Sequence, residues 1–187
     1  MQTDFNEVLE FLADLEDLEK DLRLPFIEKV LKDLMAELIR RVKLRTPVTE
    51  NETILYKLPG GNTGTLEKVG GGLRRGWTGG IEMDDPRPFV DGLMIEHSAN
   101  QFRITVVNTQ EYAEFVEFGH RQNVGQFVPV IGPVDENGIT QGAVLKKSWV
   151  EGQYPLTISI DELSQFAPEY IERELEKWLK KSIRGLT

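Results

Sequence analysis

The chain has 187 residues, of which 40% are hydrophobic and 28% charged, a composition typical of a globular protein with a substantial core. It contains no cysteine, which excludes a disulfide framework, a thiolate zinc site and a cysteine nucleophile. The net charge of −9 argues against a general nucleic-acid coat, because such a coat needs lysine and arginine to neutralise phosphate. No apolar run approaches the ~20 residues of a membrane-spanning helix, and the acidic residues after Met1 predict no secretory signal.

Two amphipathic helices are predicted at the N-terminus. Apolar residues recur every three or four positions, which indicates a helix to about Leu22 and a second from Pro25 to about Leu44. The first stretch is strongly acidic and the second is basic. The acidic run is either a solvated helix face or a docking surface for a basic partner, such as the second helix of a neighbouring copy.

A Gly-rich segment follows, and residues 49–72 are expected to form a long mobile loop. Its glycine clusters do not have the spacing of a phosphate-binding loop and do not lie between a clear strand and a helix. Nucleotide binding is therefore disfavoured.

Alternating apolar residues predict strands beyond this loop. We expect strand material at 73–77 and 81–83, and an antiparallel hairpin from 93–97 and 102–106. On that hairpin, His97 shares a face with apolar residues and is interpreted as a histidine at the edge of the core.

The second half is predicted to contain a short helix, a second hairpin and a terminal helix. The short helix should span residues 111–118, with Asn108 or Thr109 as its cap and Gly119 as its end. Residues 126–152 look like an inserted β-hairpin around the Asn-Gly turn at 137–138. A capping box at 159–162 predicts the start of a helix that ends near residue 185. The fold class is therefore α+β, as a single domain over residues 1–187.

The sequence offers almost no catalytic chemistry. His120 lies just past the short helix and could pair with that helix's C-terminus or with a carboxylate, while Glu114 and Glu117 resemble an ordinary solvated helix face. A metal site would need at least a third good ligand, and no serine lies in a nucleophile elbow. We therefore expect no enzyme activity, no catalytic residue, no metal and no cofactor.

Three patches in chain order carry a resemblance to a known family. They are Lys43 to Val48, Gly72 to Thr78, and Glu111 to Arg121. Together they resemble the gene-product-ten-like family of tailed bacteriophages, and the third patch matches the family pattern at every fixed position. Residues 127–129 and 155–159 also resemble later family segments. In this chain residues 49–71 intervene between the first two patches, where family members often join them almost directly.

The resemblance implies a structural virion protein encoded by a phage or prophage. Family members act as neck, head–tail joining or tail-completion proteins, which implies self-association into a ring and contact with neighbouring neck, portal-side or tail-tube proteins. DNA would be passing cargo, no membrane would be involved, and the protein would move from the host cytoplasm into the virion. If the acidic first helix faced the lumen of such a ring, it would repel DNA phosphates. A minor tail or tail-terminator subunit is an alternative, and a host peptide-binding or regulatory module is an alternative from another class.

Two groups of residues follow from the matched patches. The assembly candidates are Arg74, Arg75, Trp77, Glu117, Phe118, His120 and Arg121. The structural motif residues are Thr46, Pro47, Tyr112, Ala113, Val116 and Gly119.

The residues themselves leave two alternatives open. Trp77 with its arginines is either an interface anchor or a core residue beside solvated charges. Tyr112, Val116 and Phe118 are expected to pack the short helix on the sheet. Glu117 paired with His120 or Arg121 would either hold a bend inside one subunit or set the register between two copies.

Overall fold

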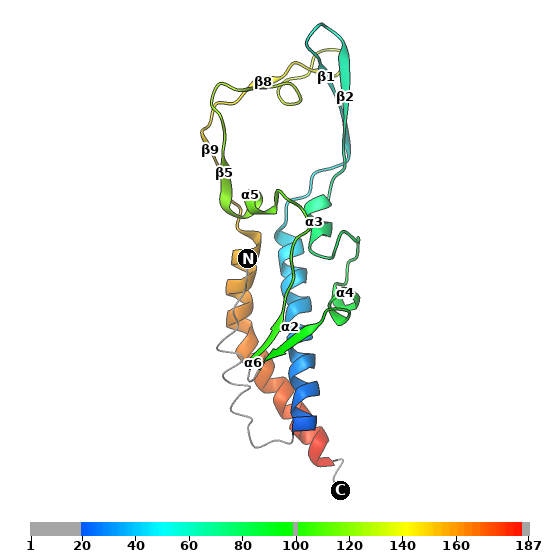
Figure 1. Cartoon of the computed structure of the whole chain (residues 1–187), viewed down its shortest axis with the longest axis vertical. Coiled ribbons are helices and arrows are strands. Elements are labelled where there is room, and N and C mark those ends of the chain that lie inside the picture. The colour runs from blue at the N-terminus through cyan, green and yellow to red at the C-terminus, as the bar shows by residue number, and fades with distance from the viewer. Residues whose placement is uncertain (1–19, 99–100, 185–187) are drawn as a thin grey trace.

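Two long helices lying side by side form the body of the protein. The structure is a computed structural model that describes residues 20–98 and 101–184. Helix α2 (Lys20–Arg45) and helix α6 (Pro155–Arg184) run antiparallel along the long axis of the molecule (Figure 1). The predicted acidic first helix lies almost wholly outside the described residues.

The core is formed where these two helices face each other. Helix α2 buries apolar side chains at helical spacing, among them Ile27, Val30 and Ile39, against Leu163 and Ile171 of α6. Phe26 and Trp178 close the far end of this contact with ring centroids 5.3 Å apart. Such close-packed apolar burial supplies most of the stability of a helix pair.

Both long helices differ from their predicted boundaries. Helix α2 runs without a break through Pro25, so the predicted boundary between two helices at residues 22–25 is wrong. Helix α6 begins at Pro155 and continues through Pro168, so the predicted capping box at Ser159 is also wrong. Ser159 is buried inside the helix, where its hydroxyl donates to the Pro155 carbonyl at 2.6 Å. Burial against the partner helix outweighs these local signals.

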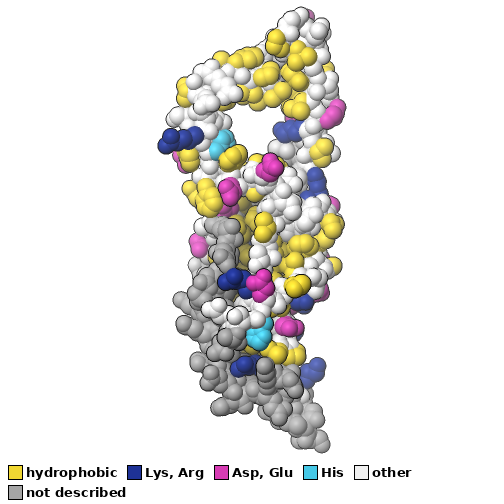
Figure 2. Space-filling view, viewed as in Figure 1, with side chains coloured by type: hydrophobic (Ala, Val, Ile, Leu, Met, Phe, Trp, Pro, Cys, Tyr) yellow, Lys and Arg dark blue, Asp and Glu magenta, His cyan; other side chains and the backbone are white. Residues whose placement is uncertain are grey.

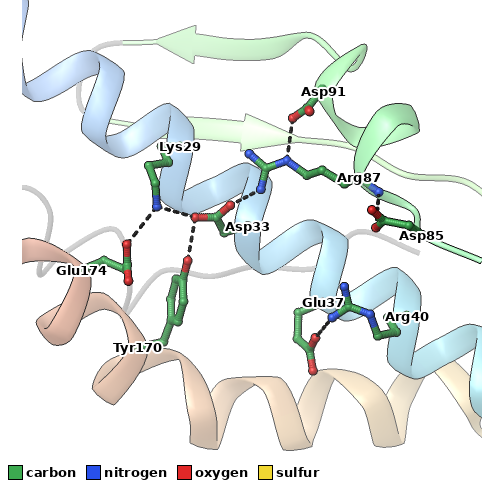
Figure 3. A network of polar contacts seen from close by, with 9 residues as sticks. All are labelled: Lys29, Asp33, Glu37, Arg40, Asp85, Arg87, Asp91, Tyr170 and Glu174. Atoms are coloured by element: carbon green, nitrogen blue, oxygen red, sulfur yellow. Dashed lines mark hydrogen bonds and ion pairs between the residues drawn. The ribbon is translucent and has the colours of Figure 1, made fainter.

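A cluster of charged and polar side chains centred on Asp33 joins α2, α6 and the short helix α4 (Arg87–Asp91) (Figure 3). The Asp33 carboxylate accepts hydrogen bonds from Lys29 at 2.8 Å, from the Tyr170 hydroxyl at 2.6 Å and from Arg87. Lys29 also reaches Glu174 at 2.9 Å. One carboxylate on α2 is therefore bonded to groups from three helices.

A β-hairpin covers the body beside α4. Strand β3 (Ile95–Ser98) pairs antiparallel with β4 (Gln101–Ile104), which confirms the predicted hairpin. Phe102 is buried in the core, whereas His97 is exposed and stacks on the Phe102 ring at 4.4 Å. The segment predicted as a strand at 73–77 instead forms helix α3 (Gly72–Gly76), and residues 81–83 form no strand.

Two arms rise from one end of the body and meet above it, and we call them the arch (residues 50–70 and 119–153). The first arm is an antiparallel hairpin of β1 (Glu52–Lys57) and β2 (Thr63–Lys68). The prediction of a loop without regular structure over 49–72 is therefore wrong for these residues. β-Branched and aromatic residues of this segment, such as Ile54 and Tyr56, favour the extended conformation of a strand.

The second arm is built from short strands. Strand β5 (Gly119–Arg121) pairs with β9 (Trp149–Glu151), and β6 (Phe127–Val128) pairs with β8 (Ala143–Val144). The turn predicted within 126–152 is present, since Gly138 N–H donates to the Asp135 carbonyl at 3.0 Å. The part of the predicted hairpin after this turn is divided into β7 (Ile139–Thr140), β8 and β9, because each of these strands pairs with a different neighbour.

The arms meet through strand β7 (Ile139–Thr140), which lies parallel to β1 with Leu55 opposite Ile139. Figure 2 shows an opening through the molecule below this contact. The α+β class is confirmed, and the strands of residues 20–98 and 101–184 are distributed over four small sheets rather than one. Within the described part of the chain, no helix is both long and apolar enough to cross a membrane.

Candidate assembly site at the junction of three motifs

The first two predicted motifs meet in the core. Thr46, at the end of α2, is 2% exposed, and its hydroxyl accepts a hydrogen bond from the Trp77 indole N–H at 3.1 Å. The same hydroxyl donates to the Val42 carbonyl at 2.7 Å. Trp77 is 8% exposed, so it is a core residue and its indole fixes α3 against the end of α2.

We expect Thr46→Val to lower the free energy of unfolding by about 1–2 kcal/mol, because valine leaves the buried indole N–H without an acceptor. Chemical denaturation followed by tryptophan fluorescence measures this change. Thr49→Val is the matched control, because Thr49 is exposed and should tolerate the change. Equal stability of the two variants would contradict this role of Thr46.

The second and third motifs are joined through Asn108. Its amide donates to the Leu73 carbonyl at 2.9 Å, and Thr109 N–H donates to the Gly76 carbonyl at 3.2 Å. A Cβ on Gly76 would lie 2.1 Å from Asn108 Oδ1, so only glycine permits this approach. Asn108 therefore holds α3 and does not cap α5 (Ala113–Phe118), whose N-cap is Tyr112 without a side-chain cap.

Glu117 joins the third motif to the start of α6. Its side chain is buried, with the residue 5% exposed, and its carboxylate accepts from Leu156 N–H at 2.9 Å and from Thr157 N–H at 2.8 Å. The Thr157 hydroxyl adds a third bond of 2.7 Å. These are amides of the first turn of α6, which lack partners within the helix and lie at its positive end. Glu117 thus binds within the subunit and does not form the predicted pair with His120 or Arg121.

Gly119 makes the sharp turn after α5, as predicted. Its φ of 81° and ψ of 177° belong to a region that is essentially open only to glycine. A Cβ at this position would also lie 2.2 Å from the Val150 carbonyl oxygen, across the β5–β9 pair.

We expect Gly119→Ala to destabilise the protein by about 3 kcal/mol or more, or to prevent folding, because the added methyl group collides with backbone in an already strained conformation. Thermal unfolding measures the change. Gly138→Ala is the matched control: Gly138 has a φ of 74° but nothing lies within 4 Å of an added Cβ, so only the cost of the backbone conformation remains. Similar losses in both variants would exclude the collision with β9 as the cause.

A cavity of about 500 Å³ opens where the second and third motifs meet the start of α6. Leu73, Trp77 and Leu156 are among its apolar lining residues, and Glu111 and Glu114 also line it. Both glutamates are exposed and neither forms an ion pair with any residue that the structure describes. The arrangement is an apolar hollow with an acidic edge.

The remaining predicted residues lie around this junction. Arg74 reaches the Thr46 carbonyl at 3.5 Å, and Arg75 lies 3.4 Å from Glu82. His120 is half-buried beside Phe115, at 5.3 Å between ring centroids, and Arg121 is exposed on β5.

Pro47 is exposed after the end of α2, and Ala113 and Val116 are half-buried on α5. Tyr112 and Phe118 are 43% and 46% exposed, so the prediction that they pack the short helix against a sheet is wrong. The hydrogen bonds between Glu117 and the start of α6 hold the short helix α5 in place instead. Among the described residues, no group of three histidine, aspartate or glutamate side chains could hold a metal ion.

The model of one protein family matches residues 10–119, more than half of the chain, and ends at the glycine turn after α5. The chain belongs to the HK97-gp10-like family. That family is described as "Bacteriophage HK97-gp10, putative tail-component". No curated protein and no solved structure matches the chain.

Membership in the HK97-gp10-like family confirms the predicted resemblance and supports a structural role in a phage particle. All three motif patches lie within or at the edge of the matched residues, since the third ends two residues beyond them at Arg121. Most of the second arm and the whole of α6 lie outside the match, as do the predicted resemblances at 127–129 and 155–159.

Sequence reasoning missed Leu156 and Thr157, whose backbone N–H groups donate hydrogen bonds to the Glu117 carboxylate. Pro155 was a usable signal, because proline is favoured in the first turn of a helix, where its missing N–H costs nothing. Pro155 therefore predicts the start of α6 better than the capping-box pattern four residues later does.

Proposed function

We propose that this protein is a structural component of the head–tail joint of a tailed phage or prophage, or completes its tail, and acts without catalysis. The match to a phage tail-component family carries the proposal. In this role the chain passes from the host cytoplasm into the virion, contacts neck, portal-side or tail-tube proteins, and encounters DNA only as cargo.

We further propose that copies associate head to tail into a ring. Large apolar side chains are exposed on the arch and on α5, where Phe115 is 54% exposed. Exposed apolar groups of this kind are typical of surfaces that another protein covers. Among the predicted assembly residues, Phe118 and Arg121 are exposed and suited to such contacts, whereas Trp77 and Glu117 act inside the subunit.

Deleting the gene in a phage that encodes this chain tests the function. We expect filled heads and tails that do not join, and restored infectivity when the gene is supplied in trans. Joined particles with tails of abnormal length would favour the tail-terminator alternative instead. Normal infectious particles that lack the protein by mass spectrometry would overturn the proposal.

A further inference from the structure

We infer that the acid-edged cavity is the docking site for residues 144–149 of a second copy of this chain. The inference rests on the proposed self-association and identifies one contact between neighbouring copies. The apolar lining of this cavity opens to solvent in the isolated subunit. Exposed apolar hollows rimmed by polar groups are characteristic of interaction sites.

The charge of the cavity edge restricts the occupant. Glu111 and Glu114 place two carboxylates beside apolar lining residues, with no cation paired to them in the described part of the chain. A suitable occupant therefore combines an apolar side chain with adjacent positive charge.

Residues 144–149 have this composition, in the order Val-Leu-Lys-Lys-Ser-Trp. Lys146 and Lys147 are exposed, and neither has an ion-pair partner among the described residues. Val144 and Trp149 are 49% and 42% exposed. In Figure 2, Lys and Arg side chains gather at the outer side of the β5–β9 arm, while acidic side chains lie below the opening.

The segment is also held in place before any contact is made. Gly125 N–H donates to the Leu145 carbonyl at 2.9 Å, Leu145 N–H to the Gln126 carbonyl at 2.9 Å, and Gln122 N–H to the Ser148 carbonyl at 2.9 Å. Backbone bonds on both sides of the lysines reduce the conformational entropy that binding would otherwise cost.

Cavity and segment lie on different elements of the same chain. Each copy therefore carries one donor and one acceptor surface, and copies that use them head to tail form a heterologous contact, which gives a ring where the rotation closes.

Charge exchange tests the inference. We expect Glu111→Lys with Glu114→Lys, and separately Lys146→Glu with Lys147→Glu, each to weaken association of the purified full chain roughly tenfold, because like charges then oppose each other. A chain with all four substitutions should associate about as well as the original chain. Sedimentation over a concentration series measures this, and Glu169→Lys with Glu172→Lys is the control on an exposed face of α6.

Mixed cross-linking identifies the two surfaces directly. Because the chain has no cysteine, Glu114→Cys in one tagged chain and Lys147→Cys in another give a disulfide only between copies. We expect the mixed product to dominate over products of either chain with itself.

The outcomes separate the two proposals. If the original chain associates but the charge variants associate equally well, or if like-with-like disulfides dominate, the docking inference is overturned while the proposed function stands. If the original chain stays monomeric at high concentration, the docking inference is likewise overturned, and the deletion phenotype then decides the proposed function.

Discussion

Replacing Glu117 with alanine is expected to lower the free energy of unfolding by about 3 kcal/mol. Alanine removes the acceptor for two amide groups and one hydroxyl at the start of α6. These groups then lose their protein partner at a position where the Glu117 side chain is buried. Chemical denaturation of the purified chain measures the loss.

Two further variants define the cause. Glu117→Gln keeps an acceptor oxygen but loses the charge that favours the helix N-terminus, so its effect should lie between those of alanine and the original residue. Glu114→Ala is the matched control, because Glu114 is exposed on the same short helix. A Glu117→Ala chain of unchanged stability that fails to assemble would show that this residue acts between subunits, contrary to its contacts here.

Replacing Asp33 with asparagine is expected to cost about 2–3 kcal/mol, because Lys29 and Arg87 lose their shared counter-charge in a partly buried site. Asp91→Asn is the control, since Asp91 pairs with the same Arg87 at 2.8 Å but on the exposed side of the cluster. Thermal unfolding of both variants at neutral pH separates the two contributions. Equal losses would contradict the central position of Asp33.

The same cluster predicts how stability depends on pH. Burial acts to raise the pKa of Asp33, but hydrogen bonds from Lys29, Tyr170 and Arg87 outweigh it and hold the pKa below its ordinary value of 3.8. Hydrogen bonds from Lys177 and Lys29 likewise lower the pKa of Glu174 from 4.5. Carboxylates with lowered pKa stabilise the folded state fully above their ordinary pKa, and this stabilisation is lost as the pH falls through the lowered values.

Stability of the original chain should therefore decline below about pH 4.5. Denaturation at a series of acidic pH values should show a shallower decline for Asp33→Asn, since that variant has already lost the titrating group. An identical pH profile for both chains would exclude Asp33 as a source of the acid sensitivity.

The junction of the motifs and the arch differ in whether their side chains find partners within one subunit, and this difference bears on the proposed ring. At the junction, Thr46 with Trp77 and Glu117 with Thr157 are satisfied inside one subunit, so these contacts stabilise the fold whether or not a partner is present. The arch instead exposes large apolar groups such as Phe127 and Val134. Burial of those groups in an assembly would provide favourable free energy that the isolated chain lacks.

Local sequence signals determined several elements of this protein. The hairpin at β3–β4, the short helix ending at Gly119 and the turn before Ile139 follow from alternation, from helical spacing and from glycine at a positive φ. The three motif patches were sufficient to predict the phage family, because they are local runs of sequence.

The tertiary structure alone decided that α2 continues through Pro25, where α6 begins and which groups the motifs bind. Helix α2 passes through Pro25 because its buried face against α6 outweighs one lost hydrogen bond. Glu117 finds its partners at Leu156 and Thr157, about 40 residues away in sequence. Such hydrogen bonds depend on which distant segments the fold brings together, whereas sequence periodicity describes only neighbours along one helix or strand.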